Sequence, residues 1–165
     1  MLLLAVMDET TRAAIDRVTV KHDKPVTLPG GQTSQVFFDC VRLSPNDLAR
    51  LAAEATGHLP SKAFDVALGV AYNGVYFASA VAGGRQVAIL QKDGNIYGPD
   101  LRGKFVVVVS DVVCTGKELL AGAAAAEKLG AKIVGFACIV DRSDGKFGGE
   151  AQPLWSAYAV RDTLG

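Results

Sequence analysis

A run of four valines, residues 106–109, constrains the fold of this chain more than any other feature. Consecutive β-branched residues favour a strand that is buried on both faces. The run ends in the polar pair Ser110 and Asp111, two more valines follow, and a tight turn at 114–116 leads into "KELLAGAAAAEKL". That last segment is typical of a helix, so the stretch predicts a buried strand that delivers a short loop onto a helix N-terminus.

Strand and helix patterns alternate through the middle of the chain. Apolar runs predict further strands at 65–70, 86–90 and 133–140, beside the one at 105–109. The segment "LSPNDLARLAAEA" starts a helix, with Ser44 as N-cap, Pro45 at the first helical position and Asp47 completing a capping box. This alternation predicts an α/β fold with a central, mainly parallel sheet and helices on both faces.

The ends of the chain add smaller elements. Residues 1–17 look helical, and "VTLPGGQTSQVFFDC" predicts two short strands around a Gly30-Gly31 turn. "QKDGNIYGPDLRGK" is a polar, glycine-rich loop, and "LWSAYAV" predicts a last strand. We find no repeat and no linker, so residues 1–165 are expected to form a single domain.

Composition narrows the function. Lys and Arg number 17 against 17 Asp and Glu, a balance that argues against nucleic acid or a membrane surface as partner. No apolar run approaches the ~18 residues of a membrane span, and the N-terminus lacks the basic region of a signal peptide. Cys40, Cys114 and Cys138 match no metal pattern and are interpreted as free thiols, which favours a cytoplasmic location.

In parallel sheets, ligands bind where strands end and helices begin. The loops after Val70, Leu90 and Val109 are therefore the candidate sites. Backbone N–H groups at the helix start attract an anion, and Gly116 lets that anion approach closely. Asp111 would repel phosphate and suits a hydroxyl or a metal-bound water. Phosphate beside hydroxyls describes a ribose 5-phosphate, although a purely structural strand-to-helix turn remains the alternative.

The same loop resembles a known family motif: four apolar residues, two acids, two apolar residues and a Thr/Gly-rich turn. This is the phosphoribosyl-diphosphate loop of type I phosphoribosyltransferases. Four other segments resemble orotate phosphoribosyltransferases in the right order: "VTLPGGQTSQVFFDC", "GVAYNGVYFASAVA", "QKDGNIYG" and "GFACIVDRSDG". The resemblance covers nearly the whole chain and implies the type I fold, with a small hood from the N-terminal strands and the C-terminal segment.

The resemblance also implies an activity and its partners. The family transfers phosphoribosyl from phosphoribosyl diphosphate to orotate in pyrimidine biosynthesis, uses Mg2+, and works as a homodimer whose partner supplies part of a mobile loop. No protein residue is expected to bind the metal directly. The expected ligands are a nucleotide, a base or phosphoribosyl diphosphate.

Residue by residue, the resemblance implies the following roles. Lys92 and Asp111 stand at catalytic positions. Phosphate and ribose would be held by Ser110, Asp111, Cys114, Thr115, Gly116, Lys117 and Glu118. The diphosphate loop corresponds to Ala71, Tyr72, Asn73 and Gly74, and the base site to Phe37, Phe38 and Arg142. Neighbouring strand residues face opposite ways, so at least one of the two phenylalanines is expected in the core.

Several positions depart from the family pattern. Asn73 replaces the diphosphate-loop Lys, and Ser110 replaces the first acid of the ribose pair. In the shortened mobile loop, Asn95 replaces a Lys and Tyr97 a His. Each lost charge-assisted contact costs about 1.5–3 kcal/mol. Two functions therefore stay open: an active phosphoribosyltransferase, for orotate or another base, and a non-catalytic nucleotide-binding or regulatory relative.

Overall fold

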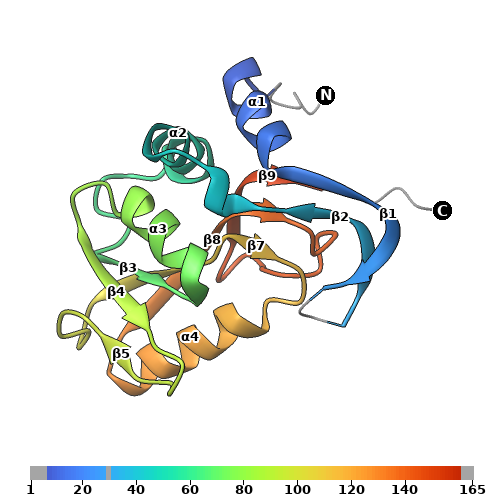
Figure 1. Cartoon of the computed structure of the whole chain (residues 1–165). Helices are drawn as coiled ribbons and strands as arrows, with labels where there is room; N and C mark the ends of the chain where they lie inside the picture. Colours follow the sequence, from blue (N-terminus) through green and yellow to red (C-terminus); the bar gives the residue numbers. More distant parts are fainter. Residues whose placement is uncertain (1–6, 29–30, 161–165) are drawn as a thin grey trace.

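The fold is built around a mainly parallel seven-stranded sheet (Figure 1). The computed structural model describes residues 7–28 and 31–160. The sheet order is β5 (Ile96–Tyr97), β4 (Gln86–Leu90), β3 (Val66–Gly69), β6 (Phe105–Val109), β8 (Lys132–Asp141) and β7 (Val112–Val113), and β9 (Leu154–Ala159) also pairs with β8. All of these pairs are parallel except β4 with β5.

The four predicted core strands are confirmed. β6 lies in the middle of the sheet, with β3 on one side and β8 on the other. Alternate valines of β6 face opposite layers, because Val107 and Val109 belong to one apolar cluster and Val106 and Val108 to the other. All four side chains are fully buried, and each such burial stabilises the fold by about 1.5–3 kcal/mol.

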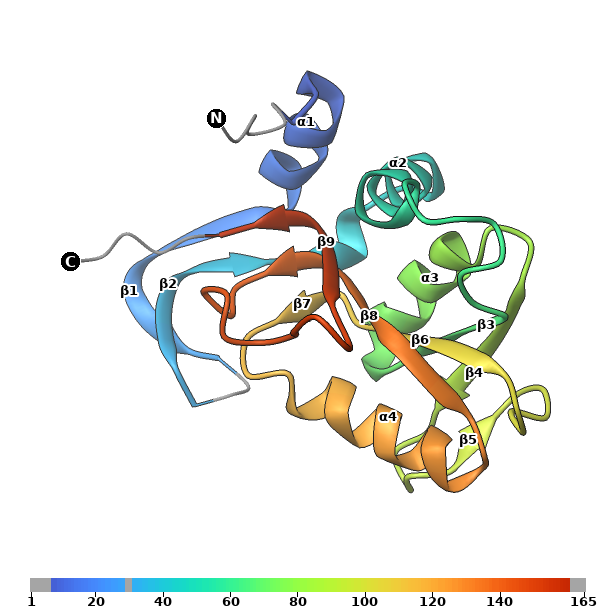
Figure 2. The same ribbon diagram turned by 180° about the vertical axis from the view of Figure 1, so that it is seen from behind.

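Helices cover both faces of the sheet, as the strand pattern predicted (Figures 1 and 2). α2 (Pro45–Thr56) and α3 (Ala71–Ala82) pack on one face, and α1 (Glu9–Val18) extends that layer. α4 (Lys117–Lys128) packs on the other face through Leu119, Ala123 and Ala126. No helix in the described ranges is long and apolar enough to cross a membrane.

The hood is a separate antiparallel pair, β1 (Thr19–Thr27) and β2 (Thr33–Phe38), joined to α2 through a 3-10 turn at Cys40–Arg42. The expected Gly30-Gly31 turn falls partly outside the described residues. The prediction that the C-terminal segment belongs to the hood is wrong for β9, because this strand pairs parallel with β8 in the main sheet. Residues 161–165 lie outside the described ranges.

Helix starts follow the predicted chemistry. The Ser44 hydroxyl accepts a hydrogen bond from the Asp47 amide at 3.1 Å, and the Asp47 carboxylate accepts one from the Ser44 amide at 3.0 Å. Asp47 also binds Arg17 at 2.6 Å, which ties α1 to α2. The helix expected over 1–17 begins at Glu9, behind an Asp8 cap, and residues 1–6 of that prediction are not described.

Two short strands were missed. β5 lies inside the segment expected to be a polar loop, and β7 lies inside the loop after β6. Both are only two residues long, so neither shows a periodic pattern in the sequence.

Candidate functional site

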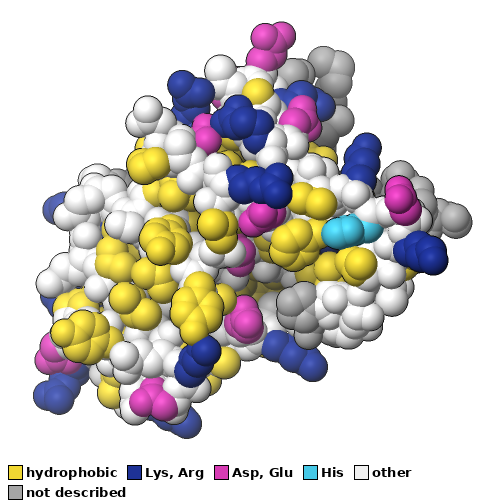
Figure 3. Space-filling model, in the orientation of Figure 1, with side chains coloured by type: hydrophobic (Ala, Val, Ile, Leu, Met, Phe, Trp, Pro, Cys, Tyr) yellow, Lys and Arg dark blue, Asp and Glu magenta, His cyan; other side chains and the backbone are white. Residues whose placement is uncertain are grey.

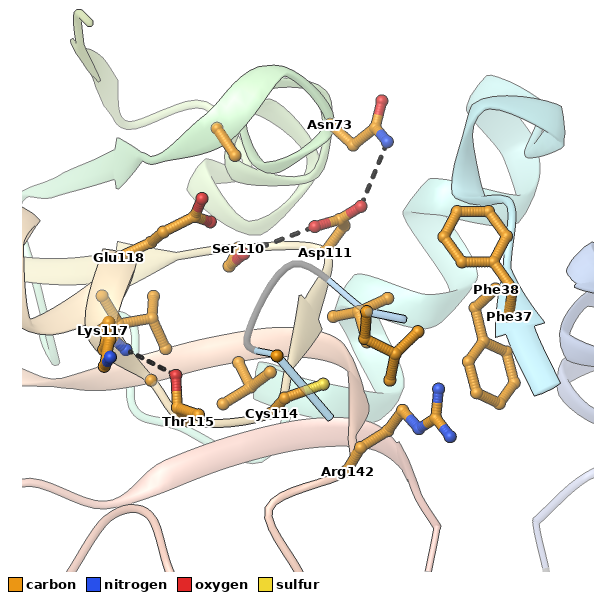
Figure 4. Close-up of a pocket in the computed structure, with 17 residues that line it drawn as sticks. Phe37, Phe38, Asn73, Ser110, Asp111, Cys114, Thr115, Lys117, Glu118 and Arg142 are labelled. Carbon is orange, nitrogen blue, oxygen red and sulfur yellow. Dashed lines mark hydrogen bonds between the residues drawn. The ribbon is translucent and has the colours of Figure 1, made fainter. Parts of the chain in front are cut away.

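A cavity of about 710 Å³ opens at the carboxyl ends of the central strands, beneath the hood (Figure 4). Its volume falls in the range of small-molecule sites. The hood contributes Leu28, Gly31, Phe37 and Phe38, the loop after β6 contributes residues 110–116, and the starts of α3 and α4 and the end of β8 contribute Ala71, Asn73, Lys117, Glu118, Leu119 and Arg142. The structure thus brings most of the predicted site residues into one cavity.

Two helix N-termini converge on this cavity. Neither α3 nor α4 has a side-chain cap among the described residues. At the start of α3, Ala71 has a φ of 58°, a left-handed conformation that costs a non-glycine residue free energy and is common at functional sites. Unpaired N–H groups and the helix dipole favour negative charge at such ends. The arrangement can hold anions at two neighbouring points.

Gly116 starts α4 with a φ of 77°, where glycine carries no steric penalty. A Cβ added to this residue would lie 2.1 Å from ring carbons of Phe147. The sequence predicts that this glycine makes room for an anion. The structure supplies a different reason, because backbone conformation and Phe147 already require glycine here.

Asp111 is held from two sides. The Asn73 side-chain amide donates to its Oδ2 at 3.1 Å, and the Ser110 hydroxyl lies 3.4 Å from its Oδ1 (Figure 4). The Asp111 carbonyl accepts from the amides of Ile139 and Val140 in β8. The carboxylate therefore faces the cavity from a fixed backbone, and its acceptor capacity is only partly used.

Ser110 borders the cavity but is only 2% exposed. Gly74 packs against it, and a Cβ on Gly74 would lie 2.8 Å from the Val109 carbonyl oxygen and 3.0 Å from the Ser110 Cα. Gly74 is needed for the close approach of α3 to β6, and it does not line the cavity. The close packing of α3 against β6 therefore accounts for a glycine at this position of the predicted diphosphate loop.

The residues predicted to form the base site lie together, with Phe37 and Phe38 on β2 of the hood and Arg142 directly after β8. Both phenylalanines border the cavity, but Phe37 is 41% exposed and Phe38 only 5%, so one of the two also joins the core, as strand alternation predicted. Arg142 donates from Nη1 to the Val36 carbonyl at 2.8 Å and from Nη2 to the Ser34 hydroxyl at 2.7 Å. Arg142 thereby fastens β2 to the end of β8.

Among the described residues, four charged side chains line the cavity, and their formal charges balance. Lys117 and Arg142 are positive, and Asp111 and Glu118 are negative. Thr115 is exposed, and its hydroxyl lies 3.5 Å from the Lys117 amide. Cys114, half-buried, completes the wall.

Besides Gly74, two more predicted residues, Lys92 and Tyr72, lie outside this cavity. Lys92 places its Nζ 5.1 Å from the centroid of the Tyr72 ring, and a hydrogen bond with Tyr72 raises the pKa of Lys92. Tyr72 itself is 72% exposed. Neither residue lines the cavity, so the catalytic role of Lys92 remains a prediction.

The segment predicted to be a mobile loop folds back on its own chain. Tyr97 pairs with Ile89 in an antiparallel hairpin, the Gln91 amide donates to the Asn95 carbonyl, and the Asn95 side chain binds Asp93. Leu101, which follows, is 1% exposed. Both ends of this short segment are thus anchored to the sheet.

The described residues contain no group of three or more His, Cys, Asp or Glu side chains able to hold a metal ion. Asp111 and Glu118 are the carboxylates that line the cavity in the described part of the chain. Mg2+ is commonly bound by one or two carboxylates together with substrate phosphates, so this donor set fits a magnesium ion that arrives with a phosphorylated ligand.

Sequence reasoning missed several parts of the site. Leu28 and Gly31 reach the cavity from the hood, and the Phe147 ring packs against Gly116 in the loop before α4. No local signal marks them. The contact between Asn73 and Asp111 joins residues 38 positions apart and also has no signature in the sequence.

No protein-family model matches the sequence. Curated relatives do. The chain is 31% identical over 148 residues to an orotate phosphoribosyltransferase of a Nocardioides species, covering 83% of this chain and 82% of that protein. It is 32% identical over 129 residues to the orotate phosphoribosyltransferase of Methanospirillum hungatei, covering 72% and 74% of the two chains.

Solved structures show the same fold. The Mycobacterium tuberculosis orotate phosphoribosyltransferase in complex with inorganic phosphate superposes with a TM-score of 0.70 at 24% identity, covering 92% of this chain and 94% of that one. The same enzyme in complex with 5-phospho-alpha-D-ribosyl 1-diphosphate gives a TM-score of 0.71 at 22% identity, covering 92% and 96%.

Proposed function

Because the chain belongs to the orotate phosphoribosyltransferase family, we propose that it transfers phosphoribosyl from phosphoribosyl diphosphate to a pyrimidine base, with orotate as the first candidate. The observation that supports this proposal most is the cavity where two uncapped helix starts meet Asp111 and the base-site residues. Anion sites, a hydroxyl acceptor and an aromatic wall are the parts that such a substrate pair needs.

The 5-phosphate is assigned to the start of α4. Backbone N–H groups of residues 115–118 serve an anion whatever side chains they carry, and Lys117 adds a positive charge. The neighbouring structure with bound inorganic phosphate supports an anion in this fold. The ribose hydroxyls then face Asp111, and Ser110 contributes a weaker, uncharged acceptor.

The base is assigned to the space beside Phe37. Its ring offers an apolar surface for a planar base. Arg142 uses two of its five N–H donors on Val36 and Ser34, so donors remain for a carboxylate on the base. A bidentate arginine contact would select orotate over bases that lack the carboxylate.

In the transfer step, the bond from the anomeric carbon to the diphosphate oxygen breaks and a bond to the base nitrogen forms. The leaving diphosphate would lie beside Ala71 and Asn73 at the start of α3. Mg2+, when bound, would offset part of the diphosphate charge, with Asp111 as the nearby carboxylate. The hood over the cavity limits access of water to the cation-like carbon.

The test is a product assay. The purified chain is incubated with Mg2+, phosphoribosyl diphosphate and orotate, and orotidine 5'-monophosphate is quantified, with uracil as the competing base. We expect product from orotate, and a rate that is lower by about tenfold or more in Asp111→Asn. The variant is purified in the same way, so that equal activity in both samples would reveal contaminating host enzyme. Product formed from uracil but not from orotate would show that orotate is not the base that this chain uses.

The second candidate function is a nucleotide-binding relative without catalysis. It is favoured by the anchored hairpin, because Lys92 lies against Tyr72 outside the cavity. Two results together would favour this candidate. The chain would bind orotidine 5'-monophosphate, and it would form no product at any substrate concentration.

We also propose a homodimer. Tyr72 and Tyr76 lie one turn apart on α3, and Tyr97 lies on β5, and all three are more than 65% exposed. Figure 3 shows hydrophobic side chains gathered over α3, β4 and β5. Exposed apolar surface of this kind is typical of protein interfaces. Sedimentation at micromolar concentration should show a dimer, and Tyr76→Asp should shift it to monomer.

A further inference from the structure

The charge around the cavity is unusual for a site that must accept a phosphate and a diphosphate together. Within residues 7–28 and 31–160, two cationic side chains and two carboxylates line the cavity, and their formal charges sum to zero. One of the cations, Arg142, is bound to the hood. A phosphate monoester alone carries about 1.5–2 negative charges at neutral pH, and a diphosphate adds more.

The two helix N-termini at the cavity differ in the positive charge that neighbouring side chains provide for an anion. At the start of α4, Lys117 adds a positive charge to the backbone N–H groups. At the start of α3, Ala71 and Asn73 line the cavity, and the polar side chain of the two, Asn73, is neutral and already donates to Asp111 at 3.1 Å. The Asp111 carboxylate itself faces this second point. Lys92, on the hairpin, is turned to Tyr72 and does not line the cavity.

Building on the proposed function, we propose that this cavity binds a pyrimidine nucleoside 5'-monophosphate more tightly than phosphoribosyl diphosphate, and that Asn73 sets this preference. The monophosphate places its single phosphate at the α4 point and leaves the α3 point empty. The donor must place a diphosphate beside Asp111 with backbone N–H groups and a neutral amide. In the transfer reaction, the donor is then the weakly bound substrate.

The test is a calorimetric titration of the wild-type chain with orotidine 5'-monophosphate and, separately, with phosphoribosyl diphosphate, both in Mg2+. We expect the nucleotide Kd to be lower by about tenfold or more, because one charge-assisted contact corresponds to about 10- to 100-fold in affinity. A donor that binds as tightly as the nucleotide, or more tightly, overturns the inference and leaves the proposed function intact. Binding of neither ligand removes the proposed function itself.

Substitutions test whether Asn73 causes the preference for the nucleotide over phosphoribosyl diphosphate. Asn73→Lys should tighten the donor about tenfold while the nucleotide Kd stays within about twofold. Asn73→Ala, which loses the contact with Asp111 without adding charge, should not tighten the donor. Gln86→Lys is the matched control, because Gln86 is exposed at the amino end of β4, on the edge of the sheet opposite the cavity. An equal gain in Gln86→Lys, or tightening of both ligands in Asn73→Lys, contradicts a role for Asn73 in selection.

Discussion

Replacing Gly116 by alanine should destabilise the chain by about 2–5 kcal/mol. The left-handed conformation at φ 77° costs an L-residue about 1–2 kcal/mol. The new methyl group would also lie 2.1 Å from the Phe147 ring, which packs edge-on against Phe136. Overpacking of this kind costs about 1–3 kcal/mol, and the two costs add.

Gly103→Ala separates the two costs. Gly103 has a φ of 70°, and no atom lies within 4 Å of an added Cβ, so only the backbone term of about 1–2 kcal/mol applies. Urea unfolding of both variants and the wild type gives the free energies directly. If Gly116→Ala costs no more than Gly103→Ala, the contact with Phe147 does not explain the glycine. In that case, room for an anion becomes the better explanation.

Further predictions concern the cavity and its surroundings. Arg142→Gln should weaken orotate binding about tenfold and speed hydrogen exchange in β2, whereas a purely solvated arginine would change neither. Ser110→Asp should tighten a ribose 5-phosphate but lower stability, because the new carboxylate would be buried beside Asp111; unchanged affinity contradicts the ribose assignment. Cys114 should react with thiol reagents before Cys40 and be protected by nucleotide; labelling that nucleotide leaves unchanged would place the ligand elsewhere. Burial, with the nearby charge of Asp111, raises the pKa of Cys40 from 9.0 to about 12, so the unfolded chain ionises first; stability should fall from pH 9 towards 12, less steeply in Cys40→Ala.

The core of the fold could be predicted because its signals are local. The strands at 86–90 and 105–109 have the observed bounds, since continuous apolar β-branched runs specify buried strands. The capping box at Ser44 and Asp47 is likewise a pattern within four residues. In contrast, β1 runs through the polar sequence "KHDK", because the middle of this strand is exposed on both sides and needs no apolar alternation.

From the residues alone, the site was predictable only where they are consecutive. The resemblance also placed Phe37, Asn73 and Arg142 in the site, and all three line the cavity. Residues 110–118 share one loop, so their common place in the cavity follows from the strand and helix around them. Arg142 and Val36 are 106 positions apart, and only the folded chain shows their contact. Lys92 was expected in the site from its position in a motif, yet the hairpin of β5 turns it towards Tyr72.

The central claim is that the cavity at the start of α4 binds the phosphoribosyl group. Backbone amide spectra of 15N-labelled protein, recorded as orotidine 5'-monophosphate is added, test it residue by residue. The account predicts the largest shifts at residues 115–118, with smaller ones in β2 through Arg142. A separate cavity is lined by residues 98–102 and 128–130. Shifts concentrated there, or no shifts at millimolar nucleotide, would contradict the claim.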